Sequence, residues 1–170
     1  YGLEVSQFAM FQNVMDGLAS LENDRKQKSI DAFKAGCEIS AALGCDIVNF
    51  VSPWPDTITA PNSYLPEYYY INVPGVDPRI RALQVFQTKL KYRFPKPFEW
   101  ERYWESHVDA VRTVTKIAGS YGFKLAIENH ANTMTPHTDS ILRLCEEVGE
   151  ENLGANLDTV WAYLQRENLP

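Results

Sequence analysis

The sequence lacks three features that mark large classes of proteins: a long apolar run, an excess of basic residues and a set of paired cysteines. No apolar run approaches the roughly 20 residues needed to cross a bilayer. The formal net charge is −6, whereas proteins that hold nucleic acid through its phosphates usually carry a basic face. We therefore expect neither a membrane nor nucleic acid among the partners.

Cysteine is scarce and does not occur in a metal-binding spacing. Cys37, Cys45 and Cys145 form no CxxC pair and are odd in number, which argues against a disulfide framework and a zinc knuckle. The first residues, YGLEVSQFAM, lack the charged segment and apolar core of a signal peptide. We expect buried or half-buried reduced thiols in a cytoplasmic protein.

Apolar patterning predicts an alternation of strands and helices. The predicted strands cover residues 2–10, 45–53, 124–130 and 154–160, and the predicted helices cover residues 24–43, 98–121, 138–148 and 161–167. Alternation of this kind requires parallel strands with right-handed crossovers. Four such strands make either an open α/β sheet with exposed edges or half of an eight-stranded barrel, in which closure removes the edges.

Residues 54–97 interrupt this alternation. The stretch contains seven of the ten prolines and the run Tyr68–Tyr70. We predict a long ordered loop inserted in a single domain of residues 1–170. Such a loop serves either as a lid or binding loop, or as a cover for the core or a subunit contact.

Two acidic residues stand at the ends of predicted strands. Glu128 closes KLAIENH and Asp158 closes GANLDTV. Ligands of parallel α/β folds bind at the carboxyl ends of the strands, and carboxylates buried there are costly unless something compensates them. A cation such as Mg²⁺ or Mn²⁺, which prefers oxygen ligands, would compensate both. The alternative is that each acid caps the following helix or pairs with a basic neighbour.

The histidines divide into one candidate and two structural residues. His130 lies two residues beyond Glu128, so it is a candidate metal ligand, partner of a ligand or substrate donor. A loop histidine without a role is the alternative. For His107, inside a predicted helix, and His137, before a helix cap, we expect structural roles.

Amides and indoles surround the same strand ends. Asn129 and Asn156 are candidate donors to sugar hydroxyls. Trp54 and Trp161 each follow a strand end, where an indole either contacts a sugar ring or packs at the rim of the fold.

Two tracts resemble the xylose isomerase-like barrel superfamily. YGFKLAIENHANTMTPHTDSILRLCEEVGEENLGANLDTVWA is similar to its fifth and sixth strands, and both carboxylates agree together with the helix between them. RKQKSIDAFKAGCEISAALGCDIVNFV resembles the third helix and fourth strand, and GLEVSQFAM then matches the third strand. The superfamily comprises sugar and sugar-phosphate isomerases and epimerases, inosose dehydratase-like lyases and endonuclease IV-type DNA repair enzymes.

The resemblance implies a (β/α)₈ TIM barrel of which this chain supplies about half, strands three to six. It also implies a divalent metal, Mn²⁺ or Mg²⁺ before Co²⁺ or Zn²⁺, held by Glu, Asp, His and Glu from strands five to eight. Glu128 matches the first ligand and Asp158 the second, while the other two would lie beyond Pro170. The implied activity is isomerisation or epimerisation of a sugar or sugar derivative through an enediolate, with Glu128 as one base.

One position departs from the family pattern. Many relatives carry a histidine three residues after the strand-six Asp, and here the residue is Trp161. A bulky indole suggests a different or larger carbohydrate, such as a glycoside or an oxidised sugar.

Three other functions compete with this one. A lyase or dehydratase acting on a keto-inositol or 3-keto sugar would use the same metal and base, so the sequence leaves it open. A non-catalytic barrel fragment is also open. DNA repair is disfavoured by three histidines and the net charge of −6. Because open sheet edges need cover, we expect a homo-oligomer or the remainder of a longer chain.

Overall fold

The computed structural model describes residues 2–11, 14–55, 57–58, 96–130, 133–164 and 167. Contacts divide the chain into two compact units, residues 1–56 with 99–170, and residues 57–98. All helices and strands described below belong to the first unit. Most of the predicted loop of residues 54–97 lies outside the described residues, so that loop and the single-domain organisation stay predictions.

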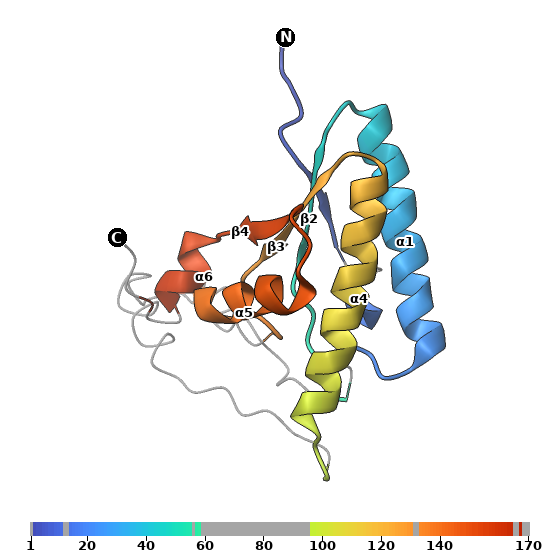
Figure 1. Ribbon diagram of the computed structural model, residues 1–170. Helices are drawn as coiled ribbons and strands as arrows, with labels where there is room; N and C mark the ends of the chain where they lie inside the picture. The colour runs from blue at the N-terminus through green and yellow to red at the C-terminus, as the bar shows by residue number, and fades with distance from the viewer. Residues whose placement is uncertain are drawn as a thin grey trace, which may run out of the picture. The chain divides into compact units, whose positions relative to one another are not determined.

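Four parallel strands form one sheet in the order β1-β2-β3-β4 (Figure 1). The strands are β1 Phe8–Met10, β2 Ile47–Val51, β3 Lys124–Glu128 and β4 Leu153–Asn156. This arrangement confirms the parallel α/β sheet predicted from the alternation of strands and helices. Because all four strands point the same way, their carboxyl ends meet at one edge of the sheet.

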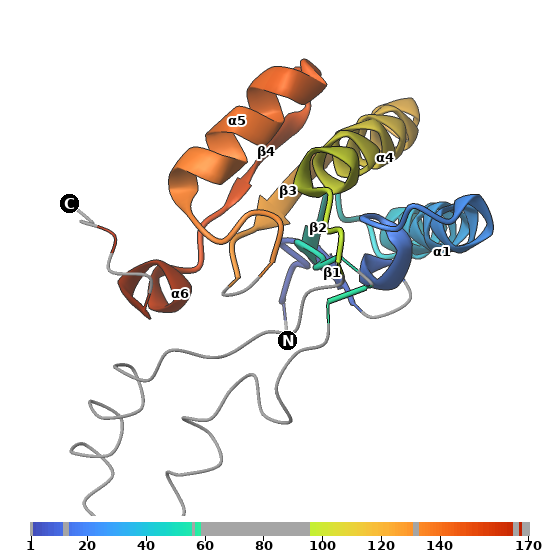
Figure 2. The ribbon, with the colours of Figure 1, turned by 90° about the horizontal axis from the view of Figure 1, so that it is seen from below.

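Helices connect the strands and cover one face of the sheet. They are α1 Asn23–Ala42, α4 Trp100–Ser120 and α5 Thr138–Val148. A short 3₁₀ helix, η1, lies at Met15–Gly17, and α6 Thr159–Leu164 follows β4. Figure 2 shows α1, α4 and α5 side by side along the sheet, and each contacts a strand that it connects. No described helix is long and apolar enough to cross a membrane.

The core lies between the sheet and these helices. Val48 and Phe50 of β2 and Leu125 and Ile127 of β3 are almost completely buried on this face. The ring of Phe33, from α1, meets Phe50 edge to face with centroids 6.1 Å apart. Full burial of one such side chain stabilises a protein by about 1.5–3 kcal/mol, so this apolar face holds the sheet and helices together.

The other face of the sheet carries polar side chains. Successive residues of a strand point to opposite faces, so the residues between the core positions face away from the helices. Asn49, Glu128 and Asn156 share this second face, because β3 pairs Glu128 with Val51 on one side and with Asn156 on the other. The fold thus places a carboxyl and two amides together.

Two predicted strands are shorter than expected. Of residues 2–10, only Phe8–Met10 pair as a strand, and among the described strands they pair with β2. The predicted strand of residues 154–160 ends at Asn156, and α6 begins at Thr159 rather than at Trp161. Asp158 therefore lies just beyond its strand.

His107 is a core residue, as predicted. It is fully buried on α4, and its Nδ1 lies 3.2 Å from the carbonyl oxygen of Leu18. This distance assigns the ring hydrogen to Nδ1, because a carbonyl can only accept. Burial lowers the pKa of His107 to about 4, although the Leu18 carbonyl opposes the shift.

Acid should destabilise the protein through His107. The ordinary imidazole pKa is 6.5 and the buried one about 4, so the unfolded state binds more protons between these values. The free energy of unfolding should fall by up to about 3 kcal/mol as the pH drops through this window. Urea denaturation at several pH values measures the slope.

The matched variants are His107→Leu and Val111→Ala, both at fully buried positions of α4. His107→Leu should flatten the dependence of the free energy of unfolding on pH. Val111→Ala should lower the free energy of unfolding at every pH but leave its pH dependence unchanged. An unchanged slope in His107→Leu would contradict the assignment.

Candidate active site

Glu128 is the last residue of β3, on the face turned away from the helices. Its Oε2 accepts hydrogen bonds from Asn156 Nδ2 at 3.0 Å and from Asn49 Nδ2 at 3.4 Å. Its Oε1 accepts none from the described residues. The two amides fix the carboxyl from the neighbouring strands and leave one oxygen available.

The surroundings of Glu128 disfavour its charge. Burial raises the pKa of Glu128, the carboxylate of Asp158 raises it further, and the hydrogen bond from Asn156 lowers it. A carboxylate whose pKa is raised binds a proton more readily than an exposed one. Perturbed acids of this kind are common at functional sites.

Asp158 caps the helix that follows it. Its Oδ1 accepts hydrogen bonds from the backbone N–H groups of Val160 at 2.8 Å and Trp161 at 3.2 Å. The helix-capping alternative is therefore confirmed for Asp158. Its Oδ2 accepts none from the described residues, so one oxygen remains for a second role.

Asn129 holds Asp158 in place. Its Nδ2 donates to the Asp158 carbonyl oxygen at 3.0 Å, and its Oδ1 accepts from the Asp158 N–H at 2.7 Å. The side chain is completely buried. Because both ends of the amide are engaged, its observed contact is with the main chain. A role as substrate donor stays a prediction.

His130 and Trp161 pack against each other. Their ring centroids are 3.9 Å apart at an interplanar angle of 43°, and they are 9% and 8% exposed. Trp54 is half-buried, immediately after Pro53 beyond the end of β2. Substrate contacts by these three side chains stay predictions, and the observed contact is that between the imidazole of His130 and the indole of Trp161.

Asn49 is the site residue that the sequence analysis missed. It is 1% exposed, and its Oδ1 is buried without a hydrogen-bond partner. A single amide stands in the otherwise apolar strand Ile47–Val51. Since buried amides need hydrogen-bond partners, this amide within an apolar strand could have marked Asn49 as a candidate site residue. Its partner, Glu128, could be identified only from the register of β2 against β3.

Glu128 and Asp158 fit part of a metal site. Each contributes a carboxylate with one oxygen that accepts no hydrogen bond from the described residues. Hard divalent cations prefer such oxygens, and a cation would offset the repulsion between the two acids. Among the described residues, no group of three or more His, Cys, Asp or Glu could hold a metal ion. The pair therefore needs further ligands.

A sequence-family model described as xylose isomerase-like TIM barrel matches residues 1–169. No curated protein shows significant sequence similarity to the chain.

Solved structures share the fold at low identity. The 3-keto-D-glucoside 4-epimerase of E. coli has a TM-score of 0.65 and 13% identity, over 98% of this chain and 52% of its own. A probable 3-DHS dehydratase from Bacillus anthracis has a TM-score of 0.62 and 15% identity. The match covers 96% of this chain and 43% of the dehydratase. A Mycobacterium smegmatis xylose isomerase-like protein in complex with magnesium has a TM-score of 0.59 and 15% identity. The match covers 99% of this chain and 45% of the M. smegmatis protein.

The chain spans about half the length of these structures. Its four-stranded parallel sheet therefore corresponds to about half of a TIM barrel, as predicted.

Removing the charge of Glu128 should stabilise the metal-free protein. The folded-state pKa is raised, so stability decreases as the pH rises from the ordinary carboxyl pKa through the raised value. At pH 7, Glu128→Gln should raise the melting temperature, whereas Glu146→Gln, at an exposed position of α5, should not. A lower melting temperature in Glu128→Gln would contradict the electrostatic account.

Replacing Trp161 should change the magnetic environment of His130. The indole shifts the imidazole ring protons through its ring current, so Trp161→Ala should remove this shift and Trp161→Phe should retain part of it. Proton NMR, with His130→Gln to assign the signal, measures the effect. Identical His130 shifts in the wild type and Trp161→Ala would refute the packing.

Proposed function

The chain belongs to the xylose isomerase-like TIM barrel family, and we propose that it provides a catalytic base and part of the metal site of a sugar isomerase or epimerase. The observation that carries the proposal is the half-buried Glu128, held by two amides beside Asp158 at the carboxyl end of β3. A fixed carboxylate with one available oxygen and a raised pKa is suited to removing a proton from carbon.

Glu128 takes the proton from the carbon next to the substrate carbonyl, which gives an enediolate. Asn156 and Asn49 keep the carboxyl oriented through their hydrogen bonds to Oε2. Returning the proton to the neighbouring carbon isomerises the sugar, and return from the opposite side by a second base epimerises it. That second base comes from outside the described residues.

Glu128 and Asp158 would hold a divalent cation, with Mn²⁺ or Mg²⁺ favoured over Co²⁺ or Zn²⁺. Such a cation would acidify the C–H bond of the substrate by polarising the carbonyl next to it. Asn129 supports this role because it fixes the main chain of Asp158 at two points. The structure of the magnesium-bound M. smegmatis protein, which has the same fold, supports a divalent metal.

The substrate is a small carbohydrate with a carbonyl group. His130, Asn129, Asn156, Trp54 and Trp161 are the residues proposed to surround it. The likeness to a protein named 3-keto-D-glucoside 4-epimerase supports an oxidised sugar or glycoside.

A lyase or dehydratase is the second candidate. It begins with the same proton abstraction, and the likeness to a probable 3-DHS dehydratase favours it. The two differ in whether a β-hydroxyl then leaves. In either case β1 and β4 are the edge strands of the sheet formed by the described residues, so a second copy or the remainder of a longer chain is proposed to cover them.

Metal content tests the proposed ligands. The full-length protein should carry a near-stoichiometric divalent metal, measured by elemental mass spectrometry, and Glu128→Ala and Asp158→Ala should lose it. Asp109→Ala removes a surface acid paired with Arg112 and should keep the metal. A full-length wild type that stays metal-free after incubation with Mn²⁺ would overturn the metal site.

Solvent exchange tests the base. Ketohexoses and 3-keto-glucosides incubated in D₂O should gain one deuterium at the reacting carbon, as seen by NMR, and Glu128→Gln should abolish the gain. Products of unchanged composition identify an isomerase or epimerase, whereas loss of water identifies a dehydratase. An epimer formed without deuterium gain would remove the two-base enediolate mechanism, whereas an isomer without deuterium gain would show that Glu128 returns the same proton.

A further inference from the structure

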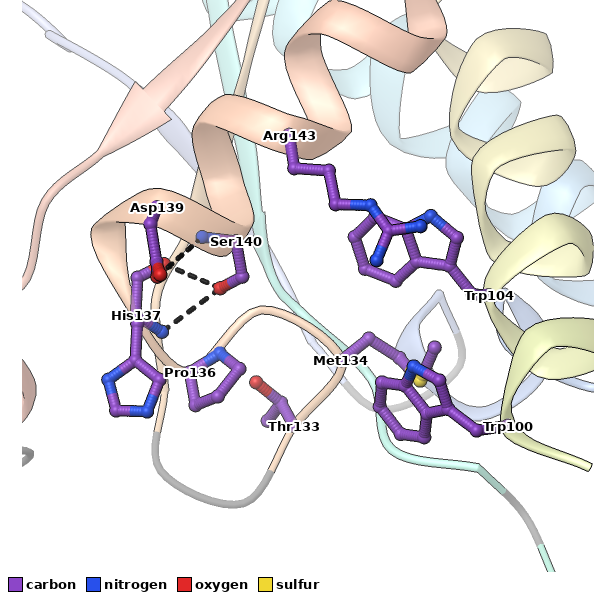
Figure 3. A pocket seen from close by; sticks show the side chains of 9 residues that line it. All are labelled: Trp100, Trp104, Thr133, Met134, Pro136, His137, Asp139, Ser140 and Arg143. Carbon is purple, nitrogen blue, oxygen red and sulfur yellow. Dashed lines mark hydrogen bonds between the residues drawn. The ribbon is translucent and has the colours of Figure 1, made fainter. Parts of the chain in front are cut away.

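A pocket of about 320 Å³ lies between the first turns of α4 and α5, apart from the residues around Glu128 (Figure 3). Thr133 and Met134, from the loop after β3, are buried beneath it. Trp100 and Trp104 line it from α4, and Asp139 and Arg143 line it from α5. None of the residues predicted as site residues from the sequence contributes to it.

The two indoles have different roles. Trp104 is 3% exposed, and its Nε1–H donates to Glu147 Oε2 at 2.7 Å. The guanidinium of Arg143 covers its ring, with Cζ 4.5 Å from the ring centroid. Trp100, one helical turn earlier, is 36% exposed. Trp104 is therefore structural, whereas Trp100 lines the pocket with part of its surface exposed.

Arg143 is oriented before any ligand arrives. Its Nε donates to Glu147 Oε1 at 2.6 Å, and the contact with Trp104 fixes the plane of the guanidinium. Its two terminal nitrogens make no hydrogen bond with the described residues. A preorganised donor of this kind costs little entropy when it binds a ligand.

Asp139 supplies an acceptor on α5. Its Oδ1 accepts from the N–H of Ser140 at 2.8 Å, and Oδ2 accepts no hydrogen bond from the described residues. The charge of Arg143 is offset by Glu147, and Asp139 adds a negative charge, so the pocket has no excess positive charge to attract an anion.

We propose that this pocket binds one neutral pyranose ring. A pyranose has an apolar C–H face that packs on an indole and a rim of hydroxyls that both donate and accept. Trp100 matches the face, while Arg143 and Asp139 match the rim. The volume lies at the lower end of ligand pockets and suits a single ring.

The pocket shares a loop with the candidate active site. Thr133 lies only five residues after Glu128, and the loop is fixed to the end of β2 by hydrogen bonds from Met134 N to Pro53 O at 2.8 Å and from Thr135 N to Ser52 Oγ at 3.2 Å. The ring is either the non-reacting ring of a glycoside held at Glu128 or a separate sugar. Binding of a ring here does not depend on the function proposed for Glu128.

The test is a titration of the full-length protein with methyl β-D-glucopyranoside, followed through the indole N–H signals in NMR. The signal of Trp100 should shift with a millimolar dissociation constant, reached by titrating to about 100 mM, because small single-ring ligands bind weakly. Trp100→Ala and Arg143→Met, followed through the indole N–H of Trp104, which also lines the pocket, should each weaken binding at least tenfold. Arg143→Met keeps an apolar stem over Trp104, and circular dichroism checks that both variants fold.

Two controls separate this pocket from other surfaces. Tyr163→Ala removes an exposed aromatic residue of α6 and should leave the affinity unchanged, as should Glu128→Gln. Absence of a shift at the highest sugar concentration, or equal affinity in Trp100→Ala and the wild type, would overturn the proposal.

Kinetics distinguish the two sources of the ring. If it belongs to the substrate, Trp100→Ala should raise KM for a glycoside and not for a free ketose. If it is a separate sugar, both KM values should stay the same while the NMR shift is still lost. An inactive protein would refute the proposed function and leave the titration decisive for the pocket.

Discussion

Glu128 sits where its surroundings disfavour its charge, and the arrangement of the described site is organised around this constraint. Burial and the carboxylate of Asp158 both oppose ionisation, while Asn156 and Asn49 donate to a single oxygen of the carboxyl. Glu128 and Asp158 lie near each other because the carboxyl ends of the parallel strands β3 and β4 meet at the same edge of the sheet. Such costs are commonly retained at sites that bind cations or move protons.

The segment after β4 is attached to the loop after β3 at three points. Asn129 holds the main chain of Asp158, the ring of His130 packs on Trp161, and Glu167 accepts hydrogen bonds from Thr138 at the start of α5. Each contact joins residues about 30 apart in the sequence. Because the contacts act on one short segment, they fix the position of Asp158 relative to the loop that follows Glu128.

The sequence was informative where local periodicity decides the structure. Apolar patterning predicted a helix over residues 24–43 and strands over residues 45–53 and 124–130, and α1, β2 and β3 lie within these ranges to within one residue. The prediction was less accurate where a side chain competes with a strand. GANLDTV has strand-like residues, but the Asp158 side chain bonds to the N–H groups of Val160 and Trp161 and starts α6. The pairing of Asn49 with Glu128 depends on register between segments 79 residues apart, which no local pattern contains.

The central claim is that Glu128 and Asp158 act as one unit on one cation. A double-mutant cycle on Mn²⁺ affinity, with Glu128→Gln, Asp158→Asn and the double variant of the full-length protein measured by calorimetry, tests it most directly. The account predicts strong non-additivity: either single change removes most of the affinity, and the second adds little. Two small and additive losses would show that the acids do not share a cation, and would contradict the account.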